Sequence, residues 1–378
     1  MRKRRVLFSG YARVHFVCFL PVYERLRADP RLEVFLSGGY KSEVDGQAKF
    51  SIDGFYDEFP VDRARVLDAE TTRQQDFDVL VCAHLSDTLF PRSVGRSVQI
   101  FHGVSFKNLA VRDKALRYDY LCLPGQYHAE QYRKQGLVSA ADESAILVTG
   151  FPKADALVAP NRDERAPLRA LGLDPALPTL LFAPTGDKHN ALEVMGREVI
   201  ERVRAWGRCN LIVKPHDHPK RAIDWFTELA ALEDDRTRLV RGTDIAPYLR
   251  AADLLITDAS SVALEYTLLD RPIVFLDTPK LFEKLRERAP ALDLDTYGRK
   301  LGRIARGPED LISVLEASLA EPGRDAALRR QAAAHLFHRP GGAAERVAAV
   351  VRHAAGLEPA LPLDVERVQP EFEHVQPE

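Results

Sequence analysis

The side chains best suited to chemistry in this chain follow an apolar run at residues 254–256. Thr257 and Asp258 follow the run, and a Ser260-Ser261 pair then opens a helix-like pattern. This order predicts a strand, a tight turn and a helix, with Ser260 as the N-cap. Serine hydroxyls and the free N–H groups of a first helical turn bind anions, and Glu265 lies one turn later, where a carboxylate can accept from ribose hydroxyls. The pattern therefore predicts a nucleotide-phosphate site, although it also fits an ordinary capped helix.

Three other strand-like runs end in polar or small residues. The first ends in His102-Gly103, the second leads to Thr185, and the third releases Lys214 and His216 together. Open α/β sheets bind ligands at the carboxyl ends of their strands, so we expect these groups to share a site. A cation and an imidazole in one turn suit a diphosphate. A lone histidine after a strand also fits a purely structural residue.

Metal and cofactor motifs are weak in this sequence. Asp293-Leu294-Asp295 resembles a metal-holding carboxylate pair, but it follows an irregular stretch and we interpret it as chance. His216-Asp217-His218 has no obvious third zinc ligand. The sequence contains neither a Walker A motif nor a GxGxxG fingerprint, which disfavours NTPase and NAD functions. We expect no metal and no cofactor.

Composition narrows the class of protein further. The 378 residues are 46% hydrophobic and 29% charged, with a formal net charge of −2. This balance suits a globular chain of two domains and gives no basic excess for nucleic-acid binding. The four cysteines lie far apart without a CxxC pair, which fits a reducing cytoplasm.

The N-terminus imitates a secretory signal, because a basic start precedes an apolar stretch. Arg13 and His15 interrupt that stretch, and no A-x-A-like cleavage site follows it. We expect a first strand at residues 6–9 and a turn at Gly10 that opens a helix, which makes Arg13 and His15 candidates for the acceptor side of a site. No apolar run approaches the roughly 20 residues of a membrane span. We expect a cytoplasmic protein for which a peripheral contact with the inner face of the plasma membrane stays open.

Strand and helix patterns alternate in two series. The expected strands are residues 6–9, 33–36, 78–82, 98–101, 120–123 and 146–149 in the first series, and 180–183, 211–214, 254–257 and 273–276 in the second. Two such series predict an α/β protein with two Rossmann-like parallel-sheet domains. The expected boundaries are 1–158, 159–340, a C-terminal helix at 341–357 that packs near the domain junction, and a disordered tail at 358–378.

Taken in order, these motifs resemble the CDP-glycerol glycerophosphotransferases, the teichoic acid polymerase and primase group. The resemblance covers roughly residues 102–346 and rests on six matches: His102-Gly103, G-x-P-x-x-D at 150–155, A-P-T at 183–185, K-x-H at 214–216, T-D-x-S-S-x-x-x-[DE] at 257–265, and L-L-D-R-P at 268–272. Two departures stand out. Residues 340–346 lack the family's usual aspartate and serine, and Gly186-Asp187 replaces a common aromatic-basic pair.

The resemblance implies a GT-B fold whose two domains face a central cleft. It also implies transfer of glycerol phosphate, or a related polyol phosphate, from a CDP-activated donor to a polymer or a lipid-linked acceptor. In the family pattern His102 matches the proposed catalytic base and His216 a second essential histidine. The Ser260-Ser261 turn matches the donor-phosphate site and Glu265 the carboxylate nearest the nucleoside. The other polar or small residues at strand ends are our further donor-binding candidates, namely Gly103, Thr185, Lys214 and Asp258.

Three other functions stay open at this point. A GT-B glycosyltransferase with a nucleotide-sugar donor would use the same fold. A UDP-sugar 2-epimerase would also share it, although such enzymes usually carry glycines where Ser260-Ser261 stands. The third is a nucleotide-binding scaffold without activity, against which the retained His102 and His216 argue.

Overall fold

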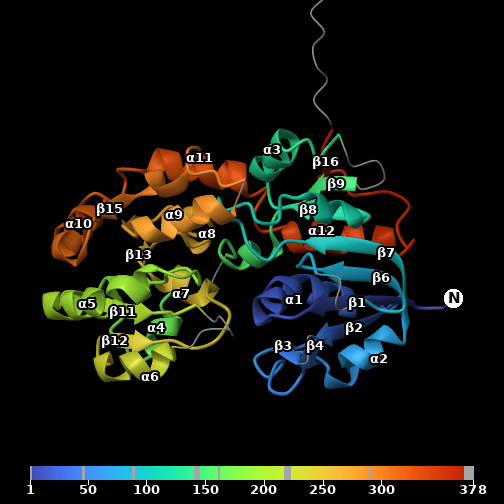
Figure 1. Cartoon of the computed structure of the whole chain (residues 1–378), viewed down its shortest axis with the longest axis horizontal. Helices are drawn as coiled ribbons and strands as arrows, with labels where there is room; N and C mark the ends of the chain where they lie inside the picture. The colour runs from blue at the N-terminus through green and yellow to red at the C-terminus, as the bar shows by residue number, and fades with distance from the viewer. Residues whose placement is uncertain are drawn as a thin grey trace, which may run out of the picture. The chain divides into compact units, whose positions relative to one another are not determined.

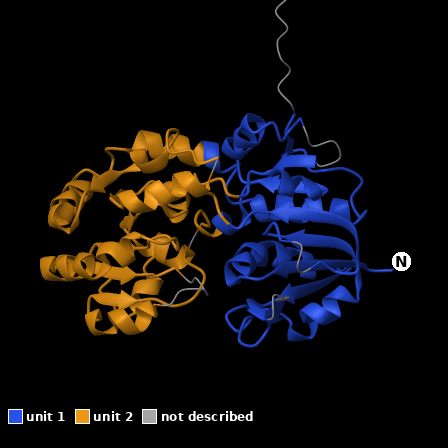
Figure 2. Cartoon of the chain, in the orientation of Figure 1, with its two compact units in different colours: residues 1–102, 110–155, 335–378 blue, residues 103–109, 156–334 orange. Residues whose placement is uncertain are grey.

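The computed structural model describes residues 2–44, 47–86, 90–139, 145–160, 162–216, 223–289 and 291–369. The chain forms two compact units (Figure 2). Unit 1 consists of Met1–His102, Ala110–Asp155 and His335–Glu378, and unit 2 of Gly103–Leu109 and Ala156–Ala334. The sequence placed the second boundary at residue 340 and did not foresee that Gly103–Leu109 leaves unit 1.

Unit 1 is built on a sheet of order β16-β9-β8-β7-β6-β1-β2-β5, in which only β16 runs antiparallel to its neighbour (Figure 1). Its strands are β1 (Arg4–Gly10), β2 (Leu32–Gly38), β5 (Val66–Leu67), β6 (Asp76–Cys82), β7 (Ser93–Ile100), β8 (Tyr120–Leu123), β9 (Ala145–Val148) and β16 (Glu366–Arg367). A separate hairpin pairs β3 (Tyr40–Val44) with β4 (Gln47–Ser51). The helices are α1 (Arg13–Arg27), α2 (Ala69–Arg73), α3 (Gln126–Lys134) and α12 (Ala343–Ala354).

The core of unit 1 explains why its central strands form. β1 and β6 are apolar runs buried on both faces, as the strands of a parallel sheet must be. α1 presents aromatic residues such as Phe16 and Phe19 to this sheet, and α12 adds Val347 and Val351 to the same cluster. α12 is the C-terminal helix that the sequence predicted at 341–357.

Unit 2 repeats the plan with a fully parallel sheet of order β12-β11-β10-β13-β14-β15. Its strands are β10 (Thr179–Phe182), β11 (Asn210–Val213), β12 (Thr237–Leu239), β13 (Leu254–Thr257), β14 (Ile273–Leu276) and β15 (Arg303–Ala305). The helices are α4 (Ala166–Ala170), α5 (Ala191–Trp206), α6 (Trp225–Leu229), α7 (Ala246–Ala251), α8 (Val262–Tyr266), α9 (Pro279–Arg288) and α10 (Pro308–Ala320). α11 (Ala326–Leu336) then carries the chain back to unit 1.

Both sheets follow the doubly wound order. Across each sheet, the third, second and first strands along the chain come first, and the fourth, fifth and sixth follow. The place where this order reverses is the switch point, which lies between β1 and β6 in unit 1 and between β10 and β13 in unit 2. Crevices at the carboxyl ends of such strand pairs are where open α/β sheets bind ligands. The prediction of two Rossmann-like parallel-sheet domains is therefore confirmed, and the topology marks two places to look for a site.

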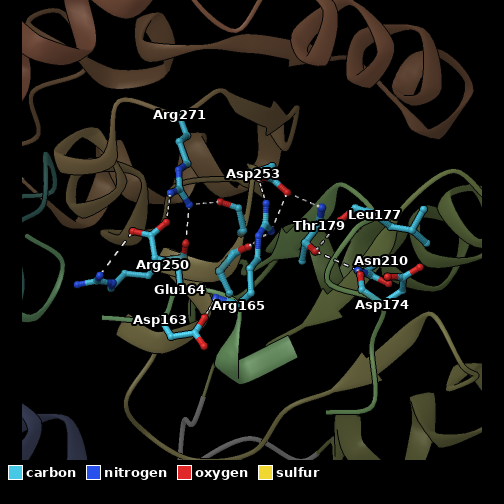
Figure 3. A network of polar contacts seen from close by, with 12 residues as sticks. Asp163, Glu164, Arg165, Asp174, Leu177, Thr179, Asn210, Arg250, Asp253 and Arg271 are labelled. Atoms are coloured by element: carbon cyan, nitrogen blue, oxygen red, sulfur yellow. Dashed lines mark hydrogen bonds and ion pairs between the residues drawn. The ribbon is translucent and has the colours of Figure 1, made fainter. Parts of the chain in front are cut away.

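The polar stretch that precedes β10 is tied into unit 2 by ion pairs and hydrogen bonds (Figure 3). The Arg165 guanidinium bonds both carboxylate oxygens of Asp253, at 2.8 and 3.1 Å, and Asp253 also accepts from the Thr179 N–H. Arg271 holds Glu164 at 2.6 Å. Because Asp253 immediately precedes β13 and Thr179 begins β10, this network fixes the two strands of the unit 2 switch point.

The tail prediction was wrong for part of its range. Glu366 and Arg367 form β16 on the outer edge of β9, and the Val368 N–H donates to the Ile146 carbonyl at 2.8 Å. The edge of β9 offers unpaired backbone groups, and these select an extended segment whatever its side chains are. Residues 370–378 lie outside the described part of the chain. Within the described part, no helix combines the length and the apolar character that crossing a membrane requires.

Candidate functional site

Asp258 joins the two turns at the unit 2 switch point. Its side chain is fully buried, and its two oxygens accept the N–H groups of Thr185 at 2.7 Å and of Ala191 at 2.8 Å. Burial raises the pKa of this carboxyl. Asp258 therefore holds the turn after β10 against the turn after β13, which is a supporting role for a residue that the sequence placed among the donor ligands.

Lys107 brings a positive charge to the same place. Its Nζ donates to the Thr185 hydroxyl at 2.8 Å and to Asp187 at 2.6 Å, and Asp187 also pairs with Arg288. Burial alone would raise the pKa of Asp187, but the charges of Lys107 and Arg288 hold it well below its usual range. Sequence reasoning missed both cations. Lys107 stands four residues after Gly103, which was the only available signal, whereas nothing in the pattern singled out Arg288.

His216 lies against the turn that follows β10. A Cβ atom on Gly186 would stand 2.7 Å from its Nδ1, so only glycine at 186 lets the imidazole approach this closely. Lys214, two residues earlier, is buried with 6% of its surface exposed. The K-x-H segment thus reaches the turn that carries Thr185. Asp217 and His218 lie outside the described residues.

The serine pair departs from the prediction in one respect. Ser261, not Ser260, occupies the N-cap position of α8, and its side chain makes no capping hydrogen bond. Ser260 is buried, and Gly103 lies close enough that a Cβ there would be 3.8 Å from the Ser261 Oγ. The turn after Asp258 is one residue longer than the sequence suggested, which moves the cap. Glu265 is on α8 and only 1% exposed, and its contact with a ribose stays a prediction.

His102, the candidate base, is held at the end of β7 in unit 1. Its Nδ1 lies 2.5 Å from the Ala83 carbonyl oxygen. A carbonyl can only accept, so Nδ1 carries the proton and the lone pair of the neutral ring is on Nε2. Desolvation lowers the pKa of His102 and the positive charge of Lys153 lowers it further, while the bond to Ala83 opposes both. The residue as a whole is exposed, while its ring packs against that of His15.

Two further imidazoles surround this residue at the unit 1 switch point. The His15 ring lies 4.9 Å from the His102 ring and 5.3 Å from the His84 ring, and Tyr11 lies 4.7 Å from His84. Burial, together with the charge of the neighbouring His102, lowers the pKa of His15 well below its ordinary value and that of His84 to about 4. His84 escaped sequence reasoning because it follows β6 without any motif around it. The cluster is a set of neutral rings near neutral pH.

Arg13 uses its charge within unit 1. One terminal nitrogen pairs with Glu58 at 2.5 Å and the other donates to the Gly54 carbonyl at 2.6 Å. Its guanidinium also lies 5.2 Å from the Tyr40 ring centre. The acceptor-side candidate is thus anchored next to the turn that precedes α1, while His15 is the one that reaches His102.

The G-x-P-x-x-D motif serves the fold of unit 1. Asp155 accepts the N–H groups of Gly341 at 2.9 Å and Ala344 at 2.8 Å, at the start of α12. Arg346 from α12 returns to the Thr149 carbonyl at 2.6 Å. Asp155 therefore caps α12 from a distant part of the chain, which explains how this helix forms although its own N-terminal loop lacks the aspartate and serine usual in the family.

Metal ligation finds little support in these side chains. Within the described ranges, no group of three or more His, Cys, Asp and Glu side chains has a geometry that could hold a metal ion. Asp293 accepts two backbone N–H groups and the Thr296 hydroxyl, which makes it a loop-shaping residue.

Comparison with known proteins agrees with this geometry. The family model of CDP-glycerol:poly(glycerophosphate) glycerophosphotransferase matches residues 79–353. The search of curated proteins finds no match. The solved structure of the wall teichoic acid polymerase TagF is 16% identical, with a TM-score of 0.61 over 94% of this chain and 89% of that one. S. aureus MnaA with UDP is 15% identical, with a TM-score of 0.57 over 96% and 99%. A UDP-N-acetylglucosamine 2-epimerase gives the same values. These structures confirm the GT-B class of the fold.

Proposed function

The chain belongs to the CDP-glycerol:poly(glycerophosphate) glycerophosphotransferase family, and from this premise we propose that it transfers glycerol phosphate from CDP-glycerol to a hydroxyl at the end of a cell-envelope polymer or its lipid-linked precursor. The acceptor oxygen attacks the β-phosphorus, the bond from that phosphorus to the bridging oxygen breaks, and CMP leaves. The observation that carries the proposal is the fixed tautomer of His102, because this chemistry needs a base near the acceptor hydroxyl.

His102 is suited to receive the acceptor proton on Nε2. Its Nδ1–H is committed to Ala83, so the free lone pair has one direction, and its lowered pKa keeps the ring neutral at physiological pH. His15, in ring contact with His102, and Arg13 are assigned to the acceptor side of unit 1. No step of this scheme requires a cofactor.

Unit 2 is assigned the donor. The leaving CMP gains negative charge, and Lys107 already stands as a fixed cation between Thr185 and Asp187. Ser260, Ser261 and Gly103 provide hydroxyls and a close backbone approach in the neighbouring turn, and Lys214 and His216 add a second cation and an imidazole. Glu265 is assigned to the nucleoside. In this assignment positive charge lies beside the departing phosphate, which stabilises the charge that builds up on it.

The acceptor and its location are inferred from relatives. One structural neighbour is a wall teichoic acid polymerase, so a cell-envelope polyanion is the acceptor that we assign to this chain. With this acceptor we propose a cytoplasmic location and a peripheral contact with the inner face of the plasma membrane.

A donor screen tests the proposal. CDP-glycerol, CDP-ribitol, UDP-sugars and CMP-sugars are compared by nucleotide release and by calorimetric binding, and we expect CDP-glycerol to bind and turn over. Binding of UDP-sugars without binding of CDP esters would instead favour a GT-B glycosyltransferase, a reading that the similarity to MnaA with UDP keeps open.

Replacement of the serine pair tests the donor site itself. The Ser260→Ala/Ser261→Ala variant should bind CDP-glycerol more weakly by about 1–3 kcal/mol, the value of two lost charge-assisted hydrogen bonds. Ser313→Ala on α10 is the control, because its hydroxyl bonds only its own helix. Equal affinity of the double variant and the wild type would remove the serines from the donor site.

A further inference from the structure

Unit 2 contains a hollow of about 640 Å³ that shares no residue with the proposed donor site. Its size is that of a ligand-binding cleft. It lies beside α9 and β15 and is lined by Asp277, Pro279, Phe282, Arg286, Leu294, Arg299, Lys300, Gly302, Ile304, Arg324 and Asp325. Four cations face two carboxylates, so the lining carries two net positive charges.

One of these cations is held in place. The Arg299 guanidinium pairs with Asp277 at 2.5 Å and lies 4.6 Å from the centre of the Phe282 ring. Arg286 follows Phe282 by four residues on α9, so the two side chains share one face of that helix. Within the described part of the chain Arg286 makes no ion pair, and Arg324 has only a long one, at 3.7 Å, with Asp325. The hollow therefore combines one ion-paired arginine, and a lysine (Lys300) that donates to the Asp295 carbonyl, with two arginines that a ligand can recruit.

The start of α9 adds to this potential. Thr278, the N-cap residue, makes no capping hydrogen bond with its side chain. It is 2% exposed, and its buried hydroxyl has no hydrogen-bond partner among the described residues. Its neighbours Asp277 and Pro279 both line the hollow. The positive end of a ten-residue helix thus opens at the same place as the arginines.

We propose that this hollow binds a stretch of the phosphodiester polymer that the enzyme extends, at a subsite separate from the reacting end. The proposal rests on the proposed function for the identity of the polymer. Guanidinium groups match phosphate oxygens in geometry and charge. Pro279, Leu294 and Ile304, the last of them 40% exposed, give an apolar floor for the methylene groups between phosphates. Alternating phosphates and short carbon links fit a lining that contains both cations and apolar side chains.

Binding of a fluorescent poly(glycerol phosphate) oligomer to the full chain tests this proposal. Arg286→Gln/Arg324→Gln removes the two lining cations that the fold uses least, and we expect the dissociation constant to rise about ten-fold, with a shallower dependence on salt. The matched control is Arg197→Gln/Arg202→Gln. It removes the same two charges from the exposed face of α5, where both arginines pair with glutamates, and it should bind like the wild type.

Transfer assays separate this inference from the proposed function. With a single-unit acceptor the Arg286→Gln/Arg324→Gln variant should turn over like the wild type, whereas its preference for long acceptors should fall. Failure of every variant and of the wild type to use CDP-glycerol would sink the proposed function and leave the oligomer-binding result standing. Equal oligomer binding by both double variants overturns the inference. If Arg286→Gln/Arg324→Gln loses binding to phosphatidylglycerol vesicles but binds the oligomer like the wild type, the inference is overturned in favour of a lipid surface.

Discussion

The two switch points occupy equivalent places in similar sheets, yet they carry opposite electrostatics. In unit 1 the segments that follow β1 and β6 carry His15, His84 and Tyr11, and both imidazoles have lowered pKa values. In unit 2 Lys107 and Asp187 form a partly buried ion pair beside the turn that follows β10. Strand order fixes where a site forms, while the side chains after each strand decide whether it offers neutral rings or fixed charge. Base catalysis needs the first and a phosphate leaving group the second.

The largest effect should come from removing the ring that the proposal makes the base. His102→Ala should lower turnover by roughly 10²–10⁴-fold, because the acceptor proton loses its destination. Donor affinity should stay nearly unchanged, since unit 2 is assigned the donor. Steady-state kinetics and calorimetry with CDP-glycerol measure the two effects. A variant that keeps near-normal turnover would move the base elsewhere, with His15 as the next candidate.

Two companion measurements separate catalysis from structure. His353→Ala is the control, because this histidine bonds only the Glu358 carbonyl near the end of α12 and lies away from the cluster. Melting curves of both variants show whether lost activity reflects lost folding. The acid limb of the wild-type turnover profile should lie below pH 6.5, since the lowered pKa of His102 keeps the base neutral to lower pH.

Breaking the charged pair of unit 2 should have the next largest effect. Lys107→Met leaves Asp187 with Arg288 and the Thr185 hydroxyl, so we expect the free energy of unfolding to fall by about 2 kcal/mol and turnover to fall about 10²-fold. Lys107→Met/Asp187→Leu should regain most of the stability, because no buried charge is left unpaired and Arg288 is half exposed to solvent, but none of the activity. Recovery of turnover in the double variant would show that Lys107 only holds the loop.

Parts of this picture could be predicted from sequence. Strands buried on both faces are continuous apolar runs in the sequence, so the two series of strands could be predicted. The polar residues that follow the ends of these strands could be identified for the same reason, namely His102, Thr185, Lys214 and His216. The short edge strands β12 and β15 could not be predicted, because three partly polar residues carry no clear pattern.

What could not be predicted depends on contacts between distant segments. Lys107 reaches Asp187 because Gly103–Leu109 folds into unit 2, a crossing that no local pattern announces. Asp155 caps α12, and β16 pairs with β9, although in each case the two segments lie far apart in the sequence. The backbone contacts of Asp258 could not be predicted either, because an acidic residue after a strand looks the same in sequence whether its oxygens face a ligand or the backbone.

Acid should expose a smaller difference between the two crevices. The pKa of His84 is about 4 in the folded protein and near 6.5 when unfolded, so protonation favours the unfolded chain. The stability that depends on a neutral His84 is fully present above pH 6.5. As the pH falls toward 4, the free energy of unfolding decreases on this account by about 3 kcal/mol at most. Between pH 7 and pH 4.5 the melting temperature of His84→Phe should fall less than that of the wild type. Parallel curves would place the acid sensitivity elsewhere.

The smallest effect, none at all, is expected from chelation, and it tests whether fixed cations suffice in unit 2. Lys107 and Arg288 meet at Asp187, beside the turns assigned to the donor phosphates, so the charge that a divalent ion would supply is already built into the protein. Asp293 belongs to the sequence pair that most resembles a metal-holding carboxylate pair. Its oxygens accept hydrogen bonds from the Thr296 hydroxyl and from the backbone of its own loop. Turnover in excess EDTA should equal the untreated rate. Loss of activity with recovery on adding Mg²⁺ or Mn²⁺ would mean that the cations of unit 2 stabilise the loops around the donor, and that the leaving group is neutralised by an ion the side chains alone do not reveal.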